Sequence, residues 1–203
     1  MKTKDRILFK ALDLFNKHGI KEVTLRQIAN ALDMSQGNLN YHFSTKAEIV
    51  SQLYFQLVER MDEEMNRLNQ NRPILSFLYE SALISMDILY EYRFITRDLY
   101  SVLERDNALK THYLELQEMR KQQYLFVFQQ LKNEGLMRAE ELEGEFERLH
   151  ERMNILGDNW INAADFFQKE GVSKVSHYHA LLFELIYPYL TLKGKEQYLE
   201  LVQ

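Results

Sequence analysis

The fold is decided by residues 24–46, which read TLRQIANALDMSQGNLNYHFSTK. Thr24 and Gln27 form a capping box, the pattern that starts a helix, and an apolar stripe with helical spacing follows them. Asp33 comes next, and aspartate tolerates the left-handed backbone that a tight turn needs. The stretch therefore predicts two short helices joined by a sharp turn.

The second of these helices carries amides where a buried helix would carry apolar groups. Ser35 can cap it, and Leu39 and Phe43, four residues apart, are its inward positions. Its other positions contain no acid: Gln36, Gly37, Asn38, Asn40, Tyr41 and His42. Asn and Gln can present a donor and an acceptor together, as adenine recognition in the major groove requires. The pattern favours a helix-turn-helix that binds DNA over a small helical corner with a solvated face.

Each candidate DNA-binding residue receives a role from its chemistry. Gln36, Asn38 and Asn40 are expected to read bases, with Arg26 assisting. Glycine near a helix N-terminus lets the backbone approach a phosphate closely. The expected phosphate contacts are Thr24, Gly37, Tyr41, His42 and Lys46.

Residues 7–46 resemble the N-terminal domain of the tetracycline-repressor (TetR) family of bacterial transcriptional regulators, and the spacing holds without a gap. The matching residues are Ile7, Ala11, Leu14, Phe15, Gly19, Thr24, Ile28, Ala29, Gly37, Leu39, Tyr41, Phe43 and Lys46. Asn40 departs from the pattern, since the family usually has an aromatic residue there that packs on the DNA backbone. This departure exchanges an expected phosphate contact for a candidate base contact. Asp33 also departs, where glycine is common in the turn.

The resemblance implies an all-α protein with a three-helix DNA-binding domain, residues 1–47, and a larger effector-binding and dimerisation domain, residues 48–203. The implied pocket lies between the lower part of helix 46–69, the three helices after it and helix 139–169. Its candidate lining residues are Tyr100, Tyr113, Tyr124 and Trp160. Cationic residues are sparse there, which favours a largely apolar or neutral effector over a polyanion. The family's dimer interface would correspond to helices 139–169 and 174–191.

Helical spacing continues through the rest of the chain. Thr45 and Glu48 form a further capping box at the start of a long helix. The expected helices are 3–18, 46–69, 73–92, 94–105, 107–134, 139–169 and 174–191. Gly19 is expected to end the first helix, Gly171 to end helix 139–169, and Gly194 to separate a short terminal piece. Pro188 is expected to kink or shorten helix 174–191.

The charge is divided unevenly along the 203 residues. The net charge is −5, yet residues 1–46 hold eight Lys or Arg and four acids, a net of +4, which leaves −9 for the remainder. A basic head on an acidic body would direct the head toward phosphate. The absence of cysteine excludes disulfides and thiol nucleophiles. No secretory signal or membrane span stands out, so we expect a cytoplasmic protein.

No catalytic constellation emerges, and we expect neither an enzyme nor a cofactor. Glu147 and His150 have the Glu-x-x-His spacing of di-iron bundles, but such sites need a second copy, so a solvated acidic face is favoured over a metal. His177 and His179 would point in different directions on a helix.

The sequence thus predicts a DNA-binding transcriptional regulator, a homodimeric repressor released from a palindromic operator by a small-molecule effector. Two alternatives stay open. One is a helical ligand-binding or enzymatic protein that no longer meets DNA, against which the basic head argues. The other is an activator or architectural protein that binds DNA without an effector.

Overall fold

The structure is a computed structural model that describes residues 2–68, 72–167 and 173–202. Its helices are α1 (Thr3–Glu22), α2 (Leu25–Asn30), α3 (Gln36–His42), α4 (Lys46–Arg67), α5 (Ile74–Glu91), α6 (Arg93–Arg97), α7 (Leu99–Glu104), α8 (Asn107–Asn133), α9 (Glu145–Phe166), α10 (Lys174–Glu184), the 3-10 turn η1 (Tyr187–Tyr189) and α11 (Leu192–Leu201). The described ranges contain no β-strand, and the predicted all-α class is confirmed. None of the described helices is long and apolar enough to cross a membrane.

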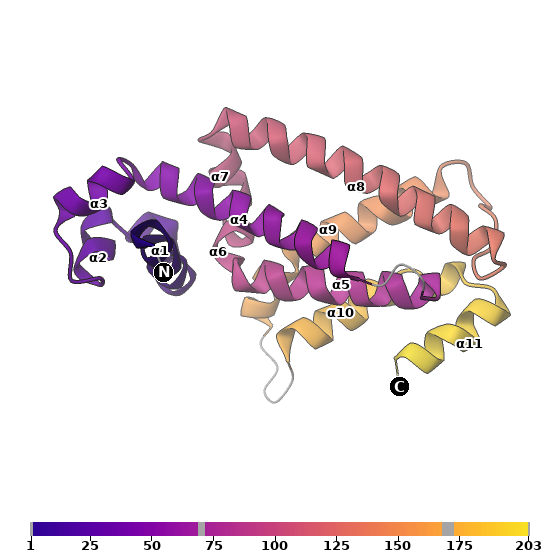
Figure 1. Cartoon of the computed structure of the whole chain (residues 1–203). Helices are drawn as coiled ribbons and strands as arrows, with labels where there is room; N and C mark the ends of the chain where they lie inside the picture. The colour runs from indigo at the N-terminus through magenta and orange to yellow at the C-terminus, as the bar shows by residue number, and fades with distance from the viewer. Residues whose placement is uncertain (1, 69–71, 168–172, 203) are drawn as a thin grey trace.

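The molecule has a head, formed by α1–α3, and a body, formed by α4–α11. Figure 1 shows the head at one end and α4 running from it along the body, so α4 belongs to both parts. α5 packs against α4 and α10, and α9 packs against α6, α8 and α10. The N-terminus lies in the head and the C-terminus at the far end of the body.

Two apolar cores hold these helices together. The first core joins α1–α4 to the end of α5, to α6 and α7 and to Leu109 at the start of α8. The second joins α5 to the end of α8 and to α9–α11. Since the first core includes Phe15 of the head and Phe94 of α6, with ring centroids 5.2 Å apart, the head shares its interior with the body. The predicted division after residue 47 therefore crosses a continuous core.

The caps at the start of the chain match their predictions. Thr24 and Gln27 form the capping box, and the Ser35 hydroxyl accepts a hydrogen bond from the Asn38 N–H at 3.2 Å. Asp33 has a φ of 53°, as the tight turn requires. At Gly19, the predicted helix end, the backbone leaves the helical conformation with a φ of 80°, and α1 continues beyond this kink to Glu22.

Several predicted helix limits were wrong. Segment 94–105 forms two helices, because Asp98 leaves the helical conformation with a φ of −131°. The helix predicted from 139 begins at Glu145, because Gly144 adopts a left-handed φ of 69° and the chain before it is irregular. The predicted end of that helix at Gly171 and most of the 69–73 linker lie outside the described residues.

Of the two predictions for the C-terminal segment, one is confirmed and one was wrong. α10 ends at Glu184 and Pro188 lies in η1, which confirms the expected shortening. Gly194, the predicted separator, instead lies inside α11. It is glycine for a packing reason, since a Cβ atom there would come within 2.1 Å of the Leu136 carbonyl oxygen.

Candidate nucleic-acid interface

α3 exposes its polar side chains and buries only one residue. Leu39 is fully buried in the first core, while the polar residues on its flanks are exposed. The exposed candidates are Gln36, Gly37, Asn38, Asn40 and Tyr41, and Tyr41 has 85% of its surface accessible. A Cβ at Gly37 would meet no atom within 4 Å, so the backbone there is open to an approaching ligand. The helix thus has one apolar anchor and a free face of amides.

The preceding helix, α2, packs against α3 and begins with a capping box. The Thr24 hydroxyl accepts a hydrogen bond from the Gln27 N–H at 3.2 Å, and the Gln27 amide oxygen accepts one from the Thr24 N–H at 2.7 Å. Thr24 and Arg26 are both exposed. His42 is half-buried and lies edge-on against the Tyr41 ring, with centroids 5.2 Å apart.

Lys46 has a role inside the head that the sequence did not indicate. Its ammonium donates hydrogen bonds to the carbonyl oxygens of Ile20 at 2.5 Å and Val23 at 2.8 Å. Burial lowers the pKa of this ammonium. Lys46 therefore joins the start of α4 to the chain that follows Gly19. The ammonium of Lys46 thus already donates to two acceptors, and its predicted phosphate contact stays a prediction.

Asn16 connects the head to the body, and the sequence analysis missed it. Its side-chain amide donates to the Glu91 carbonyl oxygen at 2.7 Å and accepts from the Phe94 N–H at 3.1 Å. Its backbone carbonyl oxygen accepts a hydrogen bond from Arg97 at 2.9 Å. A polar residue directly after Phe15, beside the buried face of α1, was the available signal. These bonds place α6 against α1.

The connection continues into the C-terminal helices. The guanidinium of Arg97 also binds the Asp165 carboxylate on α9, with the Arg97 Nε and Asp165 Oδ2 atoms 2.7 Å apart. The other Asp165 oxygen accepts from Lys174 of α10 at 2.9 Å. The hydrogen bonds and ion pairs from these two cations lower the pKa of Asp165. A continuous polar chain thus runs from the head through α6 to α9 and α10.

Of the four predicted effector-lining residues, Tyr113 and Tyr124 share one face of α8, whereas Tyr100 lies on α7 and Trp160 on α9. Tyr100 is 78% exposed, and its role in lining an effector pocket stays a prediction. Tyr113 donates to Asp158 of α9 at 3.1 Å, and Tyr124 lies beside His150, with ring centroids 5.3 Å apart. Trp160 is buried between Tyr90 and Tyr178, and its indole N–H has no partner among the described residues.

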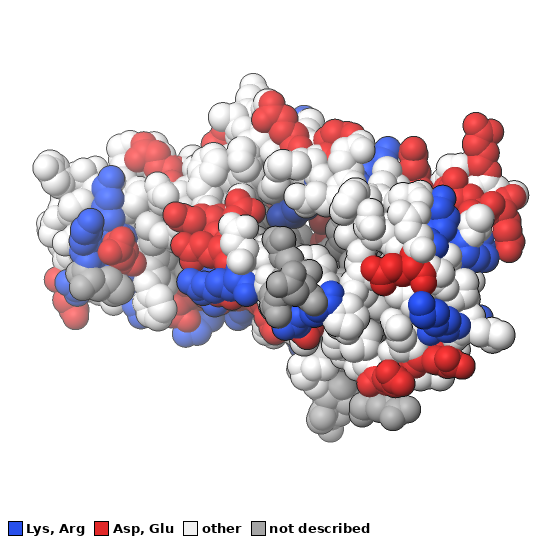
Figure 2. Space-filling model, turned by 45° about the vertical axis from the view of Figure 1, so that its right-hand side comes forward, with Lys and Arg blue, Asp and Glu red and all other residues white. Residues whose placement is uncertain are grey.

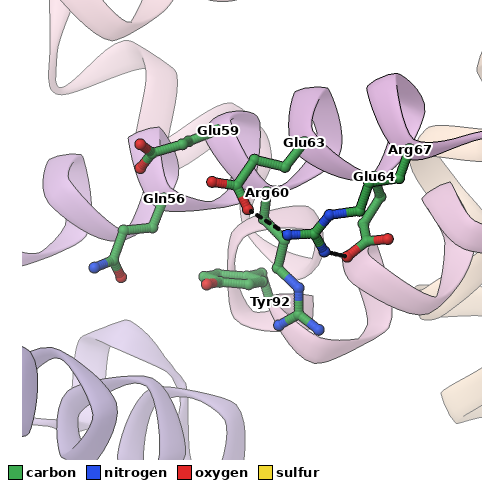
Figure 3. Close-up of a pocket in the computed structure, with 7 residues that line it drawn as sticks. All are labelled: Gln56, Glu59, Arg60, Glu63, Glu64, Arg67 and Tyr92. Atoms are coloured by element: carbon green, nitrogen blue, oxygen red, sulfur yellow. Dashed lines mark hydrogen bonds and ion pairs between the residues drawn. The ribbon is translucent and has the colours of Figure 1, made fainter.

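Side chains of α4 and Tyr92, which follows α5, line a charged hollow of about 340 Å³ (Figure 3). It is lined by Gln56, Glu59, Arg60, Glu63, Glu64, Arg67 and Tyr92. Figure 3 shows the Arg67 guanidinium between Glu63 and Glu64, to which it is 3.6 Å and 2.7 Å away. The hollow opens to solvent and contains none of the four predicted residues.

Comparison with known proteins assigns the chain. Residues 56–198 match the family model described as "Bacterial transcriptional repressor", named TetR, and residues 7–53 match "Bacterial regulatory proteins, tetR family". The chain belongs to the TetR family. It is a DNA-binding transcriptional regulator, as α3 and its exposed amides indicate.

Individual TetR-family relatives agree with this assignment. The probable regulator YttP of Bacillus subtilis is 25% identical over 69% of this chain and 68% of its own. QacR of Staphylococcus aureus is 29% identical over 57% of this chain and 66% of its own. The solved structure of a TetR-family regulator from Marinobacter aquaeolei VT8 is 28% identical, with a TM-score of 0.88 over 100% of this chain and 98% of that one. TetR regulators bind operator DNA, dimerise and bind small-molecule effectors.

Proposed function

We propose that this TetR-family protein acts as a homodimeric repressor, which binds a palindromic operator and leaves it when a largely apolar small molecule binds the body. The observation that carries the proposal is the free face of α3, where exposed amides flank one buried leucine. In a dimer, two such helices about 34–36 Å apart would enter successive turns of the major groove. The chain would act in the cytoplasm, where bacterial DNA lies, and perform no catalysis.

The residues of the head divide between sequence recognition and phosphate binding. Gln36, Asn38 and Asn40 would contact base edges, with Arg26 beside them. Thr24, Gly37, Tyr41 and His42 would bind phosphates, and Lys46 would add to them with the ammonium donor that it still has free. Residues 1–47 would form the operator-binding domain and residues 48–203 the effector-binding and dimerisation domain.

The dimer would form through α9 and α10. Ile155 on α9 is 60% exposed and Leu181 on α10 is 38% exposed, although both are large apolar residues. Phe166, at the end of α9, is 88% exposed. Apolar side chains left open on two neighbouring helices support an interface with a second copy, since association would remove them from water.

The polar chain through Asn16, Arg97 and Asp165 supports a route from effector to operator. α6 contacts the head through Asn16 and contacts α9 through Arg97. A shift of α6 or α9 in the effector-bound state would move the head and change the separation of the two recognition helices. Only an effector with unequal affinity for the two states can drive such a shift.

DNA binding tests the base-reading role directly. A labelled fragment selected from the host genome is titrated with protein, and binding is followed by fluorescence anisotropy. Gln36→Ala should lower discrimination at one base pair of each half-site by about 1–3 kcal/mol, because it removes a bidentate amide. Tyr41→Ala should weaken binding to all sequences equally. Gln52→Ala, an exposed glutamine on α4, is the matched control and should change neither.

Equal loss on every sequence from Gln36→Ala would contradict the base-reading role.

The oligomeric state is tested by sedimentation. Leu181→Glu should convert the dimer to monomer and weaken operator binding, whereas Leu192→Glu, at an exposed leucine of α11, should do neither. A wild-type protein that sediments as a monomer would overturn the dimeric proposal.

A further inference from the structure

The middle of α8 breaks the apolar pattern of the helix. Tyr113, Gln117, Arg120 and Tyr124 fall at i, i+4, i+7 and i+11, so they share one face. Buried apolar residues lie on the same face at both ends of this group. They are Leu109 before it and Phe128 and Leu131 after it. We call these four residues the α8 seam.

The α8 seam lies where the two apolar cores of the body separate. Leu109 belongs to the first core, whereas Phe128 and Leu131 belong to the second. Across from it, α4 is joined to α8 by polar side chains. Ser51 donates to Asp106 at 2.8 Å, and the Tyr54 hydroxyl lies 2.9 Å from His112 Nδ1. α8 also packs along α9 (Figure 1).

Arg120 occupies this space with too few partners. A guanidinium has five N–H donors, and here one of its nitrogens lies 3.3 Å from the Met61 sulfur, which is a weak acceptor. No carboxylate oxygen of the described residues lies within 4.0 Å of it. By helical spacing it lies one turn from Tyr124 and two turns from Tyr113 on the same face of α8. A half-buried guanidinium that no carboxylate pairs with is available to bind the carboxylate of a ligand.

Asp158, the second ionisable group of this region, has a hydrogen-bond partner. The Asp158 carboxylate accepts a hydrogen bond from Tyr113 at 3.1 Å. Burial raises the pKa of Asp158. A cationic ligand among these residues would instead meet the fixed charge of Arg120. Arg120 lacks a carboxylate partner, whereas Asp158 already has a hydrogen-bond donor. The region therefore favours a ligand with a carboxylate group over a ligand with an amine.

We propose that the α8 seam binds the acid group of an otherwise apolar effector, with the carboxylate of that effector paired to Arg120. The apolar remainder of the molecule would lie against Met61, Tyr113 and Tyr124. This inference rests on the proposed effector-controlled function and gives the effector a chemical class, a monocarboxylate with a hydrophobic body.

Binding of matched compounds tests the inference without DNA. Octanoate, 1-octanol and octylammonium share one chain, and benzoate, benzyl alcohol and benzylamine share one ring. Isothermal titration calorimetry measures the dissociation constant of each compound. In the full-length protein, at least one acid should bind about 10- to 100-fold more tightly than its alcohol, as a charge-assisted hydrogen bond gives.

Variants of Arg120 separate recognition from folding. Arg120→Met should abolish the preference for the acid, and without ligand it should unfold at the same temperature as wild type or higher, since it replaces a poorly paired cation. Arg120→Lys should retain part of the preference. Arg148→Met, at an exposed arginine of α9, is the control and should retain all of it.

Three results would overturn the inference. They are an acid preference that survives in Arg120→Met, an amine that binds more tightly than its acid, and acids that bind no better than alcohols in both series. Each leaves the proposed repressor function standing if the wild-type protein binds its operator in the anisotropy assay. Loss of operator binding would instead count against the proposed function.

Discussion

Asn16 holds the head to the body through backbone groups of α5 and α6. Asn16→Leu would leave the Phe94 N–H and the Glu91 carbonyl oxygen without this partner, and an unsatisfied buried polar group costs about 1–3 kcal/mol. We expect this loss in the free energy of unfolding, measured in urea. Asn30→Leu, at an exposed position of α2, should change stability by less than about 0.5 kcal/mol. Equal effects of the two substitutions would contradict the connecting role.

Glu145 makes the start of α9 sensitive to acid. Hydrogen bonds from Arg138 and from the Glu141 N–H lower the pKa of its carboxyl group from 4.5 to about 2. The folded state therefore binds this proton less readily than the unfolded chain, and the ion pair stabilises the protein above pH 4.5. That stabilisation is lost as the pH falls from 4.5 toward about 2.

Urea unfolding at several pH values measures the contribution of Glu145. Wild type should exceed Glu145→Gln in stability near neutral pH, and the two curves should converge as the pH falls to about 2. Glu143→Gln, at an exposed neighbour, should follow wild type throughout. A constant gap between wild type and Glu145→Gln at all pH values would show that the charge of Glu145 has no part in the difference.

Two glycines inside helices give opposite predictions. At Gly194 of α11 an added Cβ would collide with the Leu136 carbonyl oxygen, so Gly194→Ala should destabilise by about 1–3 kcal/mol. At Gly157 of α9 a Cβ would meet no atom within 4 Å, so Gly157→Ala should stabilise by about 0.4–1 kcal/mol. Thermal unfolding measures both. A rise in the melting temperature of Gly194→Ala would show that α11 can move away from Leu136.

The helix starts and the turn that the sequence predicted correctly are determined by residues close together in the chain. Thr24 and Ser35 cap their helices by contacts three residues away, and Asp33 takes the backbone conformation that its turn requires. These features need no knowledge of the rest of the chain. The exposed amide face of α3 follows from the same local pattern.

The features that the sequence did not predict depend on contacts between residues distant in the chain. The position of Gly194 is set by Leu136, and the role of Lys46 by carbonyl oxygens more than twenty residues away. The break before Glu145 accompanies its pairing with Arg138. Tyr100 belongs to an aromatic-rich segment, but composition does not indicate which of its rings face the interior. Helical spacing gives the face of a helix, whereas the partner of that face comes from the tertiary fold.

The charge of the whole molecule predicts a steep dependence on salt. Figure 2 shows acidic side chains spread over the body, while the first 46 residues carry a net charge of +4. A dimer with about six to ten phosphate contacts should lose about 10³–10⁵-fold in operator affinity between about 50 and 200 mM salt. Anisotropy titrations measure the slope. Glu63→Gln, a substitution on α4, should leave this slope unchanged. A nearly flat dependence of operator affinity on salt concentration would contradict phosphate binding by the head.

The first apolar core sets a limit on modular engineering of this regulator. Phe15 packs on Phe94, and Asn16 needs the backbone of residues 91 and 94, so the recognition unit extends into α6. A chimera that transplants residues 1–47 alone onto another regulator would expose one side of α1 to a foreign surface. A chimera that also carries the matching α6 would keep its operator specificity and its fold together. Swapping binding specificities therefore requires two separate segments of the gene to be exchanged at once.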